Sequence, residues 1–140
     1  HFTKSDKVKI NKKAVGVPFE YKCNLKDRKT GLHKKDKKTG LDIEDKRCKG
    51  NTWFIPYKTI TSKKEKGDHP AIFPEELVEH CIKISDFKAG TILDPFIGSG
   101  TSVKVVKKMN DIEGGGYNLK GIGIDIDEKY IDYCKEIIKD

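Results

Sequence analysis

The chain has 140 residues, about the size of one domain, and it is polar, with 35% hydrophobic and 36% charged residues. No apolar run is long enough for a membrane helix, and no signal-peptide pattern is present. These features argue against membrane-spanning and secreted classes and predict a soluble, cytoplasmic protein. The first residue is His1 and the only methionine is Met109, so we expect a piece of a longer protein.

Charge divides the chain into two unlike halves. Residues 1–68 carry a net charge of +11 and residues 69–140 one of −4, which gives the overall +7. A basic half beside a mildly acidic one indicates a segment that faces a polyanion. The alternative is a solvated, Lys-rich surface of the kind found in heat-adapted proteins. The four cysteines form no Cys-x-x-Cys pair, which argues against a zinc site and a disulfide framework.

The basic half shows little regular periodicity. Residues 1–26 predict short strands and turns, and residues 23–51 are rich in Lys, Asp, Gly and Thr. The tetrapeptide KTGL occurs at Lys29–Leu32 and again at Lys38–Leu41. We interpret it as a low-complexity loop and not as a structural repeat, because about ten residues cannot form a packing unit. The apolar stretch at residues 50–60 is expected to anchor this half against the other.

The second half alternates between helical and strand patterns. Residues 73–85 predict a helix with Pro74 at its start, and residues 88–94 predict a strand. A helix over 99–109, a Gly-rich loop over 110–118, a buried strand over 120–126 and an amphipathic helix over 127–140 follow. This order predicts a βαβα unit of a parallel sheet.

The stretch DPFIGSGT, residues 94–101, places an acid and two glycines between a strand and a helix. A nucleotide-like ligand meets parallel strands at this point of the fold, and glycines let the backbone approach it. A P-loop requires Gly-Lys-Ser/Thr, and a dinucleotide fingerprint requires a third glycine where Val103 stands. Because Asp94 would repel a phosphate, the turn indicates a cationic, phosphate-free ligand.

The second strand ends in Asp125, where an acid usually binds ribose hydroxyls. The alternative is that Asp125 or Asp127 caps the following helix. We expect Asp127 to be the cap and Asp125 the ribose ligand.

Three stretches together resemble a known family: HPAIFPEELVEHCI, ILDPFIGSGTSVKVV and GIGIDIDEKY. They resemble the beta-class S-adenosylmethionine-dependent DNA amino-methyltransferases of restriction-modification systems, in which motif X directly precedes motif I. The resemblance covers residues 50–138 well, including the stretch KGNTWFIPYKTI before motif X, and the first part of the chain weakly. It implies an α/β, Rossmann-like methyltransferase fold, with a basic, loop-rich recognition segment over residues 1–66 and an S-adenosylmethionine-binding α/β portion over 67–140.

The resemblance also assigns residues to the cofactor. The methionine end would be lined by His69, Pro70, Phe73 and Pro74. The turn under the cofactor would consist of Asp94, Phe96, Gly98, Ser99, Gly100 and Thr101. Asp125 would bind the ribose and Ile126 would flank the adenine. For Phe73 and Phe96, packing in the core is the alternative.

The catalytic tetrapeptide of this family, of the Asp/Ser/Asn-Pro-Pro-Tyr/Phe type, is absent, since no two prolines are adjacent. The resemblance therefore implies the C-terminal part of an enzyme that methylates the N4 of cytosine or the N6 of adenine in double-stranded DNA, and it allows a homodimer. The DNA-contact residues that it suggests are Arg28, Lys34, Lys35, Lys37, Lys38 and Arg47. The two arginines are expected to read bases. Alternatives are a catalytically incomplete DNA- and cofactor-binding module, and a methyltransferase acting on RNA or protein.

Overall fold

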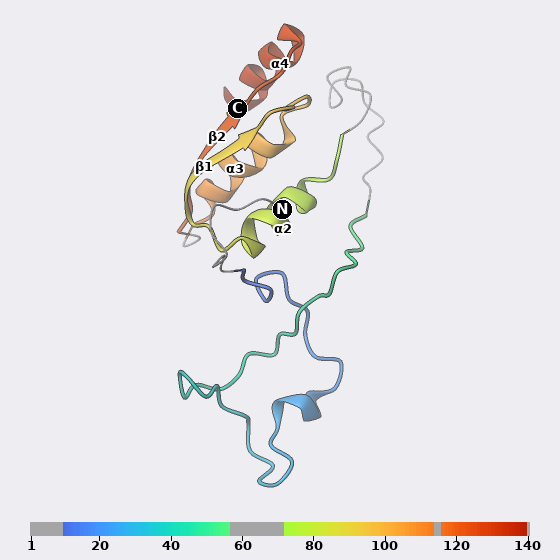
Figure 1. The fold of residues 1–140 in the computed structure, drawn as a ribbon, viewed down its shortest axis with the longest axis vertical. Coiled ribbons are helices and arrows are strands. Elements are labelled where there is room, and N and C mark those ends of the chain that lie inside the picture. Colours follow the sequence, from blue (N-terminus) through green and yellow to red (C-terminus); the bar gives the residue numbers. More distant parts are fainter. Residues whose placement is uncertain (1–9, 57–71, 114–115, 140) are drawn as a thin grey trace.

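A computed structural model describes residues 10–56, 72–113 and 116–139 (Figure 1). One short 3-10 helix, η1 (Lys22–Leu25), lies in the basic half. The second half runs α2 (Glu75–Ile84), β1 (Ala89–Asp94), α3 (Thr101–Asp111), β2 (Asn118–Gly123) and α4 (Glu128–Lys139). The predicted order of helix, strand, helix, strand and helix is confirmed, with ends displaced by a few residues. No helix in these ranges is long and apolar enough to cross a bilayer.

The two strands form a parallel sheet whose register aligns their ends. Ala89 pairs with Asn118 at one end and Asp94 with Gly123 at the other. Parallel strands need a crossover connection, and α3 supplies it. Both strands therefore finish at the same edge, and the loops that leave them lie next to each other.

The hydrophobic core lies between α3 and one face of the sheet. Val105 and Met109 of α3 are each 1% exposed, and they pack with Val106, Leu119 and Ile82. In β2, Leu119 and Gly121 lie on the face towards α3, whereas Gly123 lies against Ile97 of the turn that precedes α3. A Cβ on Gly121 would lie 3.1 Å from Cγ1 of Val103. In a dinucleotide fingerprint, a third glycine on the helix lets helix and strand pack closely, and here the glycine lies on the strand, opposite Val103.

The prediction that residues 120–126 form a buried strand is wrong. Leu93, Ile122 and Ile124 are 58%, 39% and 51% exposed. Side chains of a strand alternate between the two faces of a sheet, and the described helices pack on only one face. Residues 120–126 contain Ile at every second position, and such a run is found both in strands covered on two faces and in strands covered on one. The pattern alone therefore did not show that one face of β2 is exposed.

Residues 10–56, the arm, extend away from the α/β part formed by residues 72–139 (Figure 1). The arm is held together by isolated antiparallel bridges, which pair Val17 with Arg47, Lys26 with His33 and Lys35 with Asp42. At its base, Asn11 N donates to the carbonyl oxygen of Ile84 over 2.8 Å, and Asn11 Nδ2 donates to Asp86 over 3.2 Å. The base of the arm therefore rests on the end of α2.

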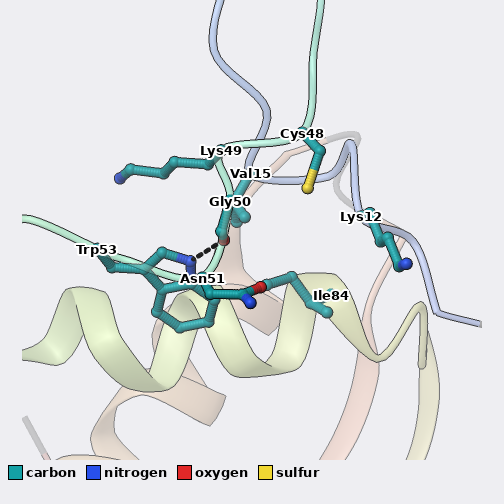
Figure 2. A pocket seen from close by; sticks show the side chains of 8 residues that line it. All are labelled: Lys12, Val15, Cys48, Lys49, Gly50, Asn51, Trp53 and Ile84. Carbon is teal, nitrogen blue, oxygen red and sulfur yellow. Dashed lines mark hydrogen bonds between the residues drawn. The ribbon is translucent and has the colours of Figure 1, made fainter.

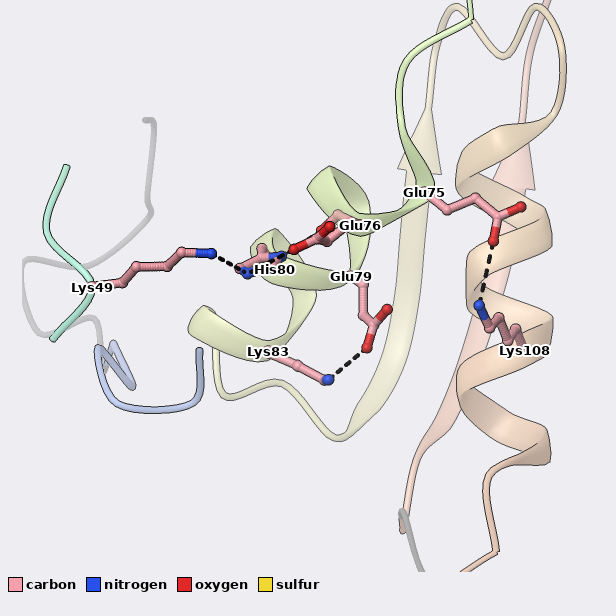
Figure 3. A network of polar contacts seen from close by, with 7 residues as sticks. All are labelled: Lys49, Glu75, Glu76, Glu79, His80, Lys83 and Lys108. Carbon is pink, nitrogen blue, oxygen red and sulfur yellow. Dashed lines mark hydrogen bonds and ion pairs between the residues drawn. The ribbon is translucent and has the colours of Figure 1, made fainter. Parts of the chain in front are cut away.

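Helix α2 connects the arm to the core through polar contacts (Figure 3). Lys49 Nζ lies 3.4 Å from Nε2 of His80, and the His80 and Trp53 rings are 5.4 Å apart. Nδ1 of His80 lies 2.6 Å from the carbonyl oxygen of Glu76, and its Nε2 lies 3.8 Å from the Glu76 carboxylate. The apolar stretch at 50–60 thus anchors the arm through Trp53, while residues 57–60 lie outside the described ranges.

At the other end of α2, Glu75 pairs with α3. Its carboxylate lies 2.8 Å from Lys104 Nζ and 3.4 Å from Lys108 Nζ. The hydrogen bond from Lys104 lowers the pKa of Glu75, so the carboxyl stays ionised, and this contact persists, at pH values below its usual titration range. An exposed pair of this kind contributes little stability, about 1 kcal/mol at most.

The two KTGL segments are a structural repeat, and the prediction of a low-complexity loop is wrong. Asp27–Leu32 and Asp36–Leu41 fold into turns with the same hydrogen bonds. The prediction failed because it required a packed core of each unit. These turns are instead specified by local hydrogen bonds from an Asp side chain to the backbone.

Truncating the core should show how much of the stability comes from α3. We expect Met109→Ala to lower the free energy of unfolding by about 2–5 kcal/mol, because the residue is fully enclosed and leaves a cavity. Lys108→Ala, one position earlier on the same helix, should cost about 1 kcal/mol or less. Denaturant unfolding followed by circular dichroism measures both, and equal losses would contradict the placement of the core.

Candidate functional site

The loops that follow β1 and β2 are joined by backbone hydrogen bonds beyond the end of the sheet. Ile124 N donates to the carbonyl oxygen of Asp94 over 2.9 Å, and Ile97 N donates to that of Ile124 over 2.9 Å. These bonds extend the strand pairing into the turn at residues 95–100. The turn and the loop at 124–127 therefore form one rigid edge.

Asp94 closes its turn from within. Its Oδ1 accepts from Phe96 N over 3.0 Å, and its Oδ2 accepts from the hydroxyl of Ser102, which is buried. Asp94 lies at the end of β1, as predicted, whereas its contact with Ser102 was not predicted. A hydroxyl in the first turn of the helix, close to the preceding strand end, was the signal that could have indicated this contact.

Asp125 bridges the two loops. Its Oδ2 accepts from Gly98 N over 2.8 Å, and its Oδ1 accepts from Asp127 N over 3.0 Å. Asp127 in turn accepts from Lys129 N over 2.9 Å in the first turn of α4. Asp127 is therefore the helix cap, as predicted. Asp125 holds the glycine turn against the second loop.

The glycines of the turn meet two separate requirements. Gly98 and Gly100 have φ values of +46° and +77°, which favour glycine. Gly100 is also close to α4, because a Cβ there would lie 2.8 Å from Cys134 Sγ and 2.9 Å from Ile137 Cδ1. The Cys134 thiol donates to the carbonyl oxygen of Gly98 over 3.4 Å, so α4 supports the turn from beneath.

The electrostatics of this edge are negative. Burial raises the pKa of the Cys134 thiol, and the carboxylates of Asp125 and Asp94 raise it further. The thiol therefore stays neutral and is not a nucleophile at physiological pH. A cationic ligand is favoured at this edge, because two carboxylates lie close to it.

The two loops of the edge carry exposed apolar side chains, and Phe73 precedes α2. Phe96 is 85% exposed and Ile126 is fully exposed, while Phe73 is 40% exposed. Packing in the core, the alternative for Phe96, is thus wrong, and Phe73 is only partly covered. Ser99 and Thr101 face each other with their hydroxyl oxygens 3.0 Å apart. The predicted residues His69 and Pro70 lie outside the described residues.

The residues suggested for DNA contacts lie along the arm and do not form one cluster. Arg28, Lys37 and Lys38 lie at the tips of the two turns, and Lys35 lies between the turns. The Nζ of Lys34 donates to the carbonyl oxygen of Asn24 over 3.1 Å. Arg47 lies at the other end of the arm, where its backbone pairs with Val17. The structure therefore separates the two arginines.

A concavity of about 190 Å³ lies at the junction of the arm with α2 (Figure 2). Its lining includes Lys12, Lys49, Asn51 and Trp53, and the indole of Trp53 donates to the carbonyl oxygen of Gly50 over 3.2 Å. None of its lining residues belongs to the strand edge. It is a feature of the junction, distinct from the edge formed by Asp94 and Asp125.

Comparison with known proteins supports the assignment suggested by the site. The model of the N6- and N4-type family described as DNA methylase matches residues 1–136. The type II methyltransferase M.HpaI of Haemophilus parainfluenzae is 38% identical over 86 residues, 61% of this chain and 24% of that protein. The orphan methyltransferase M.BamHII of Bacillus amyloliquefaciens is 37% identical over 91 residues, 64% of this chain and 31% of that protein.

A third relative, the type II methyltransferase M2.DpnII of Streptococcus pneumoniae, is 36% identical over 80 residues, covering 56% of this chain and 27% of that protein. The chain thus matches about a quarter to a third of the length of these curated relatives. With a family match over nearly its whole length, and with the strand edge that its residues build, the chain belongs to the DNA methylase family.

Proposed function

We propose that this chain forms the S-adenosylmethionine site of a cytoplasmic, site-specific methyltransferase that modifies an exocyclic amine of cytosine or adenine in double-stranded DNA. One observation carries the proposal: two carboxylates and a glycine turn are hydrogen-bonded together at the carboxyl edge of a parallel sheet. On this proposal, residues 67–140 are a portion of a Rossmann-like methyltransferase fold, and residues 1–66 contribute to DNA recognition.

The residues at the edge suit this cofactor. Asp125 places a carboxylate at the loop that leaves β2, where its oxygens accept backbone N–H groups, and a carboxylate acceptor at this point of the fold suits the hydroxyls of a ribose. Ile126 and Phe96 leave the same edge and offer apolar surface for the adenine. The charge of Asp94, already fixed within the turn by Ser102, favours the cationic end of the ligand.

S-adenosylmethionine supplies a methyl group on a sulfonium, and the amine nitrogen forms the new bond while the carbon–sulfur bond breaks. The chain's own residues hold the donor and fix its orientation. In the glycine turn, the residues assigned to this role are Gly98, Ser99, Gly100 and Thr101. In the motif X segment, which precedes α2, they are His69, Pro70 and Phe73. Such positioning is the main catalytic requirement of a direct transfer.

The acceptor side is not built by this sequence. Its five prolines are Pro18, Pro56, Pro70, Pro74 and Pro95. Since no two are adjacent, the Pro-Pro tetrapeptide that would hold the target amine is absent. This observation favours a second candidate for the isolated chain, a DNA- and cofactor-binding module without transfer activity.

Two measurements separate these functions. We expect the chain to bind labelled S-adenosylmethionine in equilibrium dialysis, and the intact protein that carries it to transfer the label to duplex DNA. Transfer by the chain alone would exclude the binding module, and absence of cofactor binding in both would overturn the proposed site.

Asp125→Asn should weaken cofactor binding by about 10- to 100-fold, because a charge-assisted hydrogen bond to the ribose is lost. Isothermal titration calorimetry with S-adenosylmethionine measures the change. Asp132→Asn, an equal change of charge on the exposed side of α4, is the matched control and should bind as the original does. Equal affinities of the two variants would count against Asp125 as the ribose ligand.

Gly123→Ala should reduce cofactor affinity without touching the ligand. A Cβ there would lie 1.8 Å from Cδ1 and 2.8 Å from Cγ1 of Ile97, whose backbone is part of the glycine turn. We expect at least a several-fold loss, partly recovered by adding Ile97→Val, which removes the closest methyl group. The same calorimetric titration tests this, and failure of the second substitution to recover any affinity would contradict the steric explanation.

A further inference from the structure

The repeated turns of the arm have the same sequence pattern and the same internal hydrogen bonds. Residues 27–32 read DRKTGL and residues 36–41 read DKKTGL, nine positions later. In the first turn, Asp27 Oδ1 accepts from the backbone N of Lys29 and of Thr30, each over 2.9 Å. In the second, Asp36 Oδ1 accepts from the backbone N of Lys38 and of Thr39, again over 2.9 Å.

The closing bonds also match. Asp27 N donates to Leu32 O, and Asp36 N donates to Leu41 O, both over 2.8 Å. The glycines of the two turns have φ values of +69° at Gly31 and +70° at Gly40. Such agreement in two neighbouring turns means that their second and third side chains leave the backbone in the same way.

The turns are joined through one residue. Lys34 N donates to Leu25 O over 2.8 Å, and Ile43 N donates to Lys34 O over 3.0 Å. Both flanks thus share the backbone of Lys34. The two tips are therefore held in one element and are not independent loops.

Each turn uses its carboxylate internally and exposes its cations. The hydrogen bond from the Thr30 backbone is the main cause that lowers the pKa of the Asp27 carboxyl, and the one from the Thr39 backbone has the same effect on Asp36. Both carboxyls therefore stay ionised and hold the turns. The exposed side chains at the second and third positions are Arg28 and Lys29, and Lys37 and Lys38. Among the described residues, none of these four forms an ion pair.

We propose that the four cations at the two tips, the twin-turn surface, contact backbone phosphates of duplex DNA. This inference rests on the proposed function, and it names the part of the arm that meets the polyanion. Paired cations on a fixed repeat can neutralise several neighbouring phosphates, and such contacts position a protein without reading sequence. Arg28 therefore acts with its counterpart Lys37 on the backbone and not as a base reader.

The two tips should contribute unequally. Residues 26–35 carry a net charge of +4, whereas residues 36–45 carry −2 because Asp42, Glu44 and Asp45 follow the second turn. The local potential is thus more positive at the first tip. Removing its cations should cost more binding than removing those of the second.

Substitution of Asp27 distinguishes the geometry of the turn from simple charge. Asp27→Asn removes a negative charge and keeps an oxygen acceptor for the turn, so the intact protein should bind duplex DNA as tightly or more tightly. Asp27→Ala removes the same charge and the acceptor, and it should bind about two- to tenfold more weakly than Asp27→Asn, because the turn must then be ordered on binding. Fluorescence anisotropy with a labelled duplex measures both, and equal affinities would overturn the role of the turn.

Salt dependence tests the phosphate contacts. The double variant Arg28→Ala/Lys29→Ala should reduce the slope of log K against log salt by about 2, and Lys37→Ala/Lys38→Ala should reduce it less. Lys120→Ala/Lys135→Ala removes two exposed charges from the α/β part and is the control, with an unchanged slope expected.

The outcomes separate this inference from the proposed function. If the double variants retain the original slope while the protein still methylates DNA, the twin-turn surface is overturned and the proposed function stands. If the protein binds S-adenosylmethionine and methylates no duplex DNA, the proposed function fails. If the double variants lose affinity for duplex RNA but not for duplex DNA, the DNA partner assigned to this surface is wrong.

Discussion

The hydrogen bonds between the turn after β1 and the loop after β2 are the constraint on which the rest of the site depends. Ile97 N binds Ile124 O, and Gly98 N binds Asp125 Oδ2, so neither loop can move without the other. The parallel register makes this possible by ending both strands at one edge. The same contacts fix the carboxylate of Asp125 and the positive-φ backbone of Gly98, which are the groups proposed to meet the cofactor.

Helix α2 has a comparable role between the two parts of the chain. Glu75 at its start pairs with α3, and His80 in its middle contacts Lys49 and Trp53 of the arm. The strand edge and the basic arm are therefore placed relative to each other by one short helix. Under the proposed function, this helix would set the geometry in which the methyl donor and the DNA meet. The surface ion pairs are individually weak, so the buried contacts of α3 carry most of the stability.

Sequence reasoning succeeded where the determining interactions are local. Pro74 and the acids after it mark the start of α2, and Asp127 caps α4, because capping depends on residues within one turn of the helix. Sequence reasoning failed for the exposed face of β2, because an apolar run does not show whether one or both faces of a strand are covered. It also failed for the twin turns, although their signal is local, because the criterion applied was core packing and not hydrogen bonding by the Asp side chain.

By itself, the sequence determined the order of helices and strands, the position of the glycine turn between a strand and a helix, and the acids at or just after the two strand ends. Periodicity, glycine and proline carry that information within short windows. Only the tertiary structure decided that Ser102 fixes Asp94, that Asp125 holds Gly98, and that Gly123 makes room for Ile97. The first two are hydrogen bonds and the third is a steric fit. All three join residues that come together only when the parallel strands align, so no local pattern can specify them.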